Sequence, residues 1–133
     1  MTRKELEEYI SLTYGVEPEY PWDDVSHGVF RHKAGRKWFA IVMRIGRDRL
    51  GLKEEGTVDV LNVKCAPTLT AALPAEPGFY PAYHMNKKHW ISIALDGSAR
   101  DEDIRWLLDM SYDMTNKLPG RKVKNTEKTE EEV

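Results

Sequence analysis

Residues 81–90 have the sequence Pro-Ala-Tyr-His-Met-Asn-Lys-Lys-His-Trp, which brings aromatic, imidazole, amide and ammonium groups close together. Such side chains can stack on a ring and donate hydrogen bonds, so they suit a phosphate, a carboxylate or a peptide. The apolar segment that follows, residues 91–95, predicts a buried strand that holds this loop in place. A structural alternative stays open: Tyr83 and Trp90 are core aromatics, and Asn86 and Lys87 form a turn.

The other reactive side chains give little support for a metal site or for catalysis. No two of the four histidines have the i, i+4 spacing of a helical metal-binding pair; they are His27, His32, His84 and His89. The single cysteine, Cys65, follows an apolar pattern and is expected to be a small buried residue. No spacing pairs a nucleophile with a base and an orienting group. We therefore expect no enzyme activity, no metal and no cofactor.

Charge is distributed unevenly along the chain, although the formal net charge is only -2. Residues 27–53 carry eight lysines and arginines against the single carboxylate of Asp48, whereas residues 1–24 and 96–113 are acidic. A basic segment can attract an anion locally even when the total charge is close to zero. The alternative is an ordinary solvated surface, on which charges serve solubility.

The elements that must position these groups are mainly strands. Apolar runs and alternations predict five strands, at residues 26–33, 37–44, 49–53, 58–65 and 88–95. Turns at Gly35 and Gly46 are expected to join the first three into two neighbouring hairpins that are rich in lysine and arginine. A short helix is expected at residues 67–73, followed by an irregular connection.

Three finer expectations concern packing. Both faces of residues 37–44 are apolar, which indicates a central strand with Trp38 on the same face as Ala40. The apolar phase switches between Val60 and Leu61, which predicts a β-bulge. Trp22, in a proline-rich loop, is expected to pin that loop onto the core.

Two longer helices are expected at the ends of the domain. Thr2 and Glu5 have the spacing of a capping box, and an apolar stripe follows them. The last helix is expected over residues 101–117, with Ser98 or Asp101 as its cap.

This order of elements predicts an α+β fold, an antiparallel sheet of about five strands with the N- and C-terminal helices packed on one face. Residues 1–118 are expected to form a single domain. Residues 119–133 are almost all charged or polar and predict a disordered tail.

Composition restricts the compartment. No apolar run is long enough to cross a membrane, and the N-terminal residues lack the apolar region of a secretory signal. One cysteine excludes an internal disulfide. We expect a cytoplasmic protein, monomeric, with no membrane partner.

Four sequence blocks resemble the MmcQ/YjbR family: residues 37–40 (Lys-Trp-Phe-Ala), 61–67 (Leu-Asn-Val-Lys-Cys-Ala-Pro), 80–90 and Ser111-Tyr112. The resemblance covers residues 1–117, and 81–90 is its most specific part. It implies a small bacterial cytoplasmic protein with a frataxin-like α+β fold. It also implies DNA binding through a double-wing arrangement of hairpins.

Two hypotheses of function follow. In the first, DNA phosphates contact the two basic hairpins and the 83–88 loop through Arg31, Lys33, Arg36, Lys37, Arg44, Arg47, Arg49, Lys64, Lys87 and Lys88. In the second, the chain is a non-catalytic module that binds a small anion or a peptide through Tyr83, His84, Asn86 and Lys87.

Overall fold

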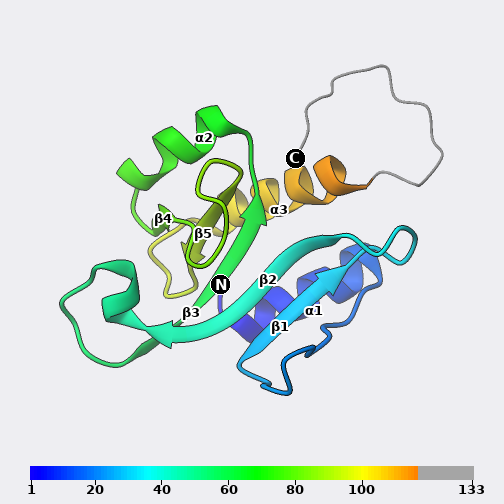
Figure 1. Ribbon diagram of the computed structural model, residues 1–133, viewed down its shortest axis with the longest axis horizontal. Coiled ribbons are helices and arrows are strands. Elements are labelled where there is room, and N and C mark those ends of the chain that lie inside the picture. The colour runs from blue at the N-terminus through cyan, green and yellow to red at the C-terminus, as the bar shows by residue number, and fades with distance from the viewer. Residues whose placement is uncertain (117–133) are drawn as a thin grey trace.

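A five-stranded antiparallel sheet forms the centre of the computed structural model, which describes residues 1–116 (Figure 1). The strands lie in the order β1-β2-β3-β5-β4. Their bounds are His27–Arg31 (β1), Trp38–Gly46 (β2), Thr57–Lys64 (β3), Phe79–Pro81 (β4) and Trp90–Ala94 (β5). The helices are α1 (Arg3–Tyr14), α2 (Pro67–Ala72) and α3 (Asp101–Thr115), with short 3-10 helices η1 (Arg47–Leu50) and η2 (Leu73–Ala75). The predicted α+β class is confirmed.

The main core lies between the sheet and the two terminal helices. Leu6 and Ile10 of α1 and Leu107 of α3 are fully buried against strand residues such as Phe39 and Ile93. Figure 1 shows both helices behind the sheet, as the sequence predicts. Their apolar stripes are thereby removed from water, which is the main stabilising term for amphipathic helices.

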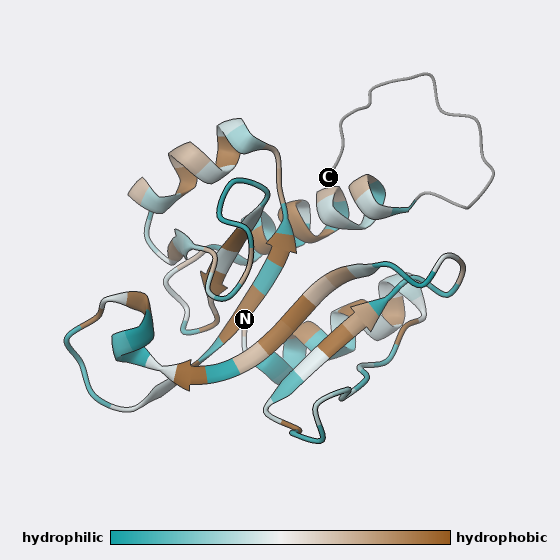
Figure 2. Ribbon diagram, viewed as in Figure 1, coloured by the Kyte–Doolittle hydropathy of each residue, from teal (hydrophilic) through white to brown (hydrophobic). Residues whose placement is uncertain are grey.

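The opposite face of the sheet carries a second, smaller apolar cluster. Val29, Ile41, Met43, Val60 and Ala94 are buried there, and no residue of α1, α2 or α3 belongs to this cluster. Loops cover it in part. The central strands therefore bury apolar residues on both faces; in Figure 2, β2 is brown over most of its length, whereas teal bands interrupt the brown of β3.

One predicted strand is absent, and one strand was not predicted. The strand expected at residues 49–53 is wrong, because the chain forms η1 and then turns at Gly51, where φ is 81°. The fifth strand is instead β4, which lies in the segment predicted to be irregular. It pairs only with β5, over Phe79, Tyr80 and Pro81.

The predicted bulge is also wrong in position. The pairing of β3 with β2 and with β5 is regular across Val60 and Leu61, which simply face opposite sides of the sheet. An irregularity lies instead in the pairing of β1 with β2: Phe30 pairs with Ala40 and Arg31 with Trp38, so Phe39 of β2 is the extra residue.

That irregularity changes which face each residue of β2 presents. Phe39 and Ala40 both pack toward the helices, whereas Trp38 packs on the opposite face. The expectation that Trp38 and Ala40 share a face is therefore wrong.

The predicted cap of α1 is confirmed. The Thr2 hydroxyl accepts the Glu5 backbone N–H at 3.1 Å, and the Glu5 carboxylate accepts the Thr2 N–H at 2.9 Å. The cap expected for α3 is wrong: its N-cap is Arg100, with no side-chain capping bond. The Ser98 hydroxyl instead donates to the Asp96 carboxylate in the turn before the helix, and Asp101 pairs with the amino terminus.

No helix within residues 1–116 is long and apolar enough to cross a membrane. The disordered tail predicted at residues 119–133 lies outside the described part of the chain.

Candidate ligand-binding cleft

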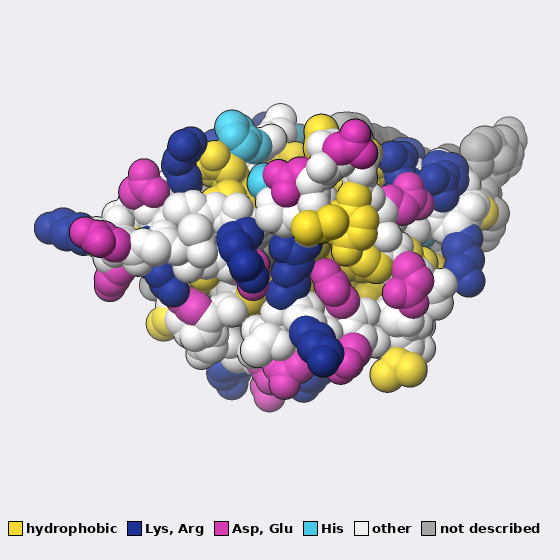
Figure 3. Space-filling model, turned by 90° about the horizontal axis from the view of Figure 1, so that it is seen from below, with side chains coloured by type: hydrophobic (Ala, Val, Ile, Leu, Met, Phe, Trp, Pro, Cys, Tyr) yellow, Lys and Arg dark blue, Asp and Glu magenta, His cyan; other side chains and the backbone are white. Residues whose placement is uncertain are grey.

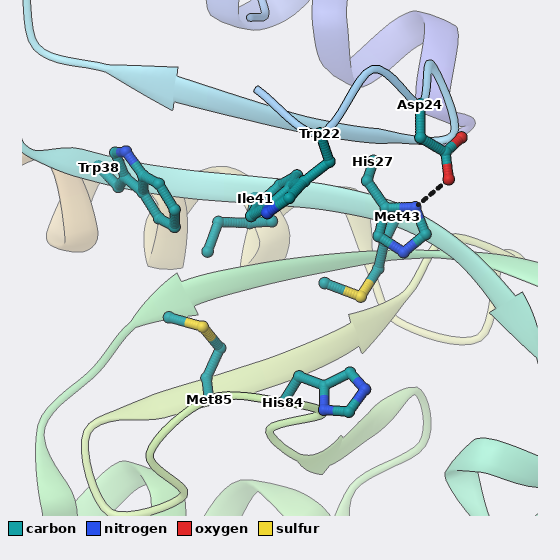
Figure 4. A pocket seen from close by; sticks show the side chains of 8 residues that line it. All are labelled: Trp22, Asp24, His27, Trp38, Ile41, Met43, His84 and Met85. Carbon is teal, nitrogen blue, oxygen red and sulfur yellow. Dashed lines mark ion pairs between the residues drawn. The ribbon is translucent and has the colours of Figure 1, made fainter. Parts of the chain in front are cut away.

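A cleft of about 450 Å³ opens on the helix-free face of the sheet. We call it the cleft throughout. Its walls come from the loop before β1, from β1 and β2, and from the loop between β4 and β5 (Figure 4). The lining side chains are Trp22, Asp24, His27, Trp38, Ile41, Met43, His84 and Met85.

The floor of the cleft is set by the pairing of β1 with β2. His27 lies opposite Met43 in this register, and Arg31 lies opposite Trp38. Residues two apart on a strand face the same side, so Ile41 and Met43 both point away from the helices. The pairing therefore places an imidazole beside an apolar floor.

Trp22 closes the upper wall of the cleft. Its ring packs edge-on against Trp38, with centroids 5.7 Å apart, and lies 6.3 Å from the ring of His27. Half of the Trp22 side chain, 51%, is exposed. Trp22 thus contacts the helix-free face at its edge, and the expectation that it pins its loop onto the core is corrected.

Asp24 and His27 form a hydrogen-bonded pair on the same wall. Asp24 Oδ2 lies 3.3 Å from His27 Nδ1 (dashed in Figure 4), and Asp24 Oδ1 accepts the backbone N–H and the hydroxyl of Ser26. The hydrogen bonds from Ser26 hold the pKa of Asp24 below its ordinary value. These contacts fix the carboxylate, and they orient the imidazole through its Nδ1 edge.

The lower wall is the β4–β5 loop, and a buried polar network anchors it to the sheet. Ser92 accepts the backbone N–H of Tyr83 at 2.9 Å and donates to Asn62 Oδ1, while Asn62 Nδ2 donates to the Tyr83 carbonyl at 3.0 Å. Ser92 and Asn62 are fully buried. Each polar group in this network has a partner, which is what burial of an amide on an apolar face requires.

The far end of the same loop is held as well. The Asn86 carbonyl accepts the backbone N–H groups of His89 and Trp90, and its side chain accepts the N–H of Lys88. Thr70 of α2 donates to the Lys88 carbonyl at 2.9 Å. Asn86 thus shapes a turn rather than lining the cleft.

Between these two anchors, His84 adopts a left-handed backbone conformation, with φ of 60°. This conformation is uncommon for residues other than glycine and points to a local constraint. The ring of His84 lies 4.0 Å from that of Tyr83, whose hydroxyl accepts a hydrogen bond from Arg49 at 3.2 Å.

All five arginines predicted to contact DNA have carboxylate partners. Glu19 pairs with both Arg31 and Arg36, at 3.0 and 3.2 Å. Each of the remaining three has its own carboxylate within 4.0 Å: Arg44 with Asp59, Arg47 with Asp96, and Arg49 with Asp48. The face shown in Figure 3 accordingly mixes basic and acidic side chains.

The predicted lysines differ from these arginines. Lys33 and Lys37 lie in the β1–β2 turn, and Lys87 and Lys88 lie in the β4–β5 loop. Within residues 1–116, none of these four ammonium groups has a carboxylate at ion-pairing distance. Lys64 ends β3, where its backbone N–H donates to Ser111.

Cys65 has the surroundings of a structural residue. It is fully buried, and burial raises the pKa of its thiol to about 11. The thiolate is therefore scarce at neutral pH. No group of three or more potential metal ligands is present in the described chain.

Comparison with known proteins places the chain in a family. The sequence matches the YjbR family model over residues 12–114. The chain belongs to the YjbR family. It is 34% identical to YyaQ of Bacillus subtilis over 116 residues, which is 86% of this chain and 98% of YyaQ. It is 36% identical to YjbR of Escherichia coli K12 over 75 residues, 55% of this chain and 64% of YjbR. Both relatives are described as uncharacterized proteins.

Solved structures give the same result for the fold of this YjbR-family protein. A crystal structure of a Pseudomonas syringae protein matches with a TM-score of 0.84 and 37% identity, over 86% of this chain and 99% of that one. A Deinococcus radiodurans protein matches with a TM-score of 0.66 and 24% identity, over 87% and 79% of the two chains. The second likeness concerns the fold alone.

The cleft of this YjbR-family protein overlaps only partly with the predicted site. Of the four residues predicted to bind a small anion, His84 lines the cleft, and Tyr83 packs against it. Asp24, His27 and Trp38 were not predicted as site residues. Their only local signal is that they are polar or aromatic residues at, or just before, the starts of predicted strands, and the pairing of β1 with β2 brings them together.

Proposed function

We propose that this YjbR-family protein is a non-catalytic binding module that takes a small molecule with an apolar, planar body in the cleft. The observation that carries the proposal is a concave site of about 450 Å³ on the only sheet face that α1 and α3 leave uncovered. Small-molecule sites in proteins have this size, and they combine apolar walls with a few convergent polar groups.

The lining of the cleft is divided in a way that favours such a ligand. Trp38, Ile41 and Met85 lie toward one end, while Asp24, His27 and His84 lie toward the other (Figure 4). Indole and thioether groups are adaptable apolar surfaces that pack well on flat rings. Bound in this way, a planar body covers the apolar end and directs its polar part toward the imidazoles.

The test is a titration with indole and 2-naphthol, followed by the amide resonances of residues 22–27, 38–43 and 83–85. We expect shifts confined to these residues. Trp22→Ala is expected to weaken binding at least about fivefold, since a ring contact is worth about 1 kcal/mol beyond its buried area. Trp106→Ala is the matched control, because Trp106 is similarly exposed (52% against 51%) and lies on α3. Equal affinity of both variants, or no shifts, would overturn the proposal.

DNA binding is the second candidate function, and a specific observation favours it. Four lysines without carboxylate partners in the described chain, Lys33, Lys37, Lys87 and Lys88, lie on the β1–β2 turn and the β4–β5 loop, each of which runs directly into or contains residues that line the cleft. Ammonium groups of this kind contact phosphates without first breaking an ion pair. The five paired arginines contribute less, because each contact with phosphate competes with a carboxylate of the same chain.

Salt dependence measures how many of these cations take part. Four phosphate contacts predict a slope of log K against log[salt] of about -3.6, at about -0.9 per contact. Lys37→Gln and Lys87→Gln are each expected to reduce that slope by about one contact. Lys4→Gln, an exposed change on α1, is the control. Absence of binding to a 20-base-pair duplex at low salt excludes this candidate.

A further inference from the structure

Two imidazoles, His27 and His84, lie on opposite walls at the polar end of the cleft (Figure 4). They come from segments far apart in the sequence, one at the start of β1 and the other in the β4–β5 loop. His84 can donate a hydrogen bond from whichever ring nitrogen carries its proton. His27, whose Nδ1 faces Asp24, donates from Nε2 in its imidazolium form, so an acceptor placed between the walls can contact both.

The backbone conformation of His84 and the hydrogen bonds of its neighbour Tyr83 hold the imidazole in position. The left-handed φ of 60° at His84 costs free energy in a residue with a Cβ. The Tyr83 peptide next to it is fixed on both sides by Asn62 and Ser92, which are buried among apolar side chains. A strained residue on a loop with a fully paired polar anchor is an arrangement that fixes a side chain for binding.

The charged groups beside the cleft are already paired. Among the lining residues within 1–116, Asp24 is the only carboxylate, and Ser26 and His27 already occupy its two oxygens. Arg31 lies over the Trp38 ring, 5.5 Å from its centroid, and Arg49 donates to the Tyr83 hydroxyl beside His84, but Glu19 and Asp48 already pair with these two arginines. The two imidazoles are therefore the donors that the cleft itself presents, and the complement to such donors is an oxyanion.

We propose that His27 and His84 together bind the acidic head, a carboxylate or a phosphate, of a ligand whose apolar body lies against Trp22, Trp38 and Met85. Asn62 and Ser92 act as positioning residues for His84. This inference rests on the proposed small-molecule function and specifies the chemical class of its ligand.

The experiment compares probes that differ only in the head group. Indole-3-propionate is titrated against indole-3-propionamide, and 2-naphthyl phosphate against 2-naphthol, at fixed ionic strength with amide resonances as the readout. We expect each acid to bind at least about tenfold more tightly than its neutral counterpart, because hydrogen bonds to charged groups are the stronger kind. The two pairs separate a carboxylate site from a phosphate site.

Three single variants show which imidazole gives the preference for the acid over the neutral probe. His84→Asn removes the imidazole yet tolerates a left-handed backbone, and His27→Gln removes the other imidazole. Each is expected to reduce the ratio of acid to neutral affinity toward one. His89→Gln, in the same loop but outside the cleft lining, is expected to leave that ratio unchanged.

Ser92→Ala tests the positioning role. We expect the acid-to-neutral ratio to fall while affinity for the neutral probe is kept, an outcome that general loosening of the fold does not produce. If Ser92→Ala does not fold, the surface variant His84→Asn still tests whether the His84 imidazole gives the preference for the acid.

The possible failures are distinguishable. If acid and neutral probes bind the cleft equally, the oxyanion inference is overturned while the proposed binding function stands. If no probe of either kind shifts the cleft resonances, the proposed function itself fails.

Discussion

At the residue scale, Ser111 shows how one hydroxyl joins two strands. It donates to the Phe39 carbonyl at 2.6 Å and accepts the Lys64 N–H at 2.9 Å. The regular pairing of β2 with β3 ends one step earlier, at Ala40 opposite Val63. Ser111 is fully buried, so without its hydroxyl both backbone groups lose their partner away from water.

We expect Ser111→Ala to lower the free energy of unfolding by about 2 kcal/mol, because an unsatisfied buried polar group costs about 1–3 kcal/mol. Urea unfolding followed by circular dichroism measures this difference. Thr13→Ala removes a hydroxyl from an exposed position of α1 and is expected to change stability by less than about 0.5 kcal/mol. Equal effects of the two substitutions would show that the Ser111 bridge contributes nothing.

His32 is a second buried polar residue with a defined partner. Its Nε2 lies 2.7 Å from Thr115 Oγ1, and the Thr115 hydroxyl donates to the Ser111 carbonyl at 2.8 Å. Because the proton of Thr115 is used in that bond, its oxygen accepts from the imidazole. Only 2% of His32 is exposed, and desolvation lowers its pKa.

This lowered pKa predicts a pH dependence of stability. The unfolded chain, with a histidine pKa near 6.5, takes up the proton before the folded chain does as the pH falls. The stability linked to neutral His32 is therefore complete above about pH 6.5 and is lost below it, by at most about 1.4 kcal/mol per pH unit. His32→Gln is expected to flatten the slope of unfolding free energy between pH 7 and pH 5. An unchanged slope in His32→Gln contradicts the assignment.

At the element scale, strong local signals are the ones that predicted structure. The capping box of Thr2 and Glu5 marks the start of α1, and the alternation of Ile91 and Ile93 assigns the faces of β5 correctly. The weak signals failed for physical reasons. β4 is a three-residue strand that has no periodicity of its own and exists because β5 offers it a partner.

The cleft was less predictable than the elements. Its lower wall follows from residues 81–90, because that loop is dense in polar and aromatic groups. Its upper wall depends on which residue of β1 pairs with which residue of β2, as when His27 meets Met43. Register is a long-range property, and the irregularity beside Arg31 moved Trp38 to a face that simple alternation does not give.

Gly78, in the turn before β4, gives a prediction at this scale. Its φ is +89°, and a Cβ there lies 2.7 Å from the Ala99 nitrogen and 2.8 Å from Ser98 Oγ. Gly97 has a similar φ of +90°, but a Cβ there has no atom within 4 Å. The two glycines therefore separate backbone strain from steric overlap.

We expect Gly97→Ala to cost about 1 kcal/mol of stability, which is the left-handed strain alone. Gly78→Ala is expected to cost about 2 kcal/mol more, because the backbone of Ala99 must move to relieve the overlap. Thermal and urea unfolding of both variants give the comparison. Similar losses of unfolding free energy for the two variants would mean that the turn at Gly78 relieves the overlap with Ala99 without a further loss of stability.

At the scale of the whole molecule, the charge pattern of the sequence is largely cancelled by folding. The acidic segment before β1 returns to the sheet, where Glu19 pairs with Val29 in a β-bridge and places its carboxylate between Arg31 and Arg36. Asp59 and Asp96 similarly meet arginines of the basic segment. The surface potential is therefore weaker than a segment of eight cations suggests, although the sum of charges is unchanged.

Glu19 allows this cancellation to be measured. Glu19→Gln releases Arg31 and Arg36 from their shared carboxylate, and it is expected to elute from a heparin column at higher salt than the native protein. Glu17→Gln makes the same change in net charge two residues away, where the carboxylate accepts from Ser11 and has no arginine partner in the described chain. If both variants shift equally, net charge alone sets retention and the pairing by Glu19 has no effect on the surface. A larger shift for Glu19→Gln means that the fold suppresses a basic patch at the β1–β2 hairpin, since exposed ion pairs hold only weakly against a competing polyanion.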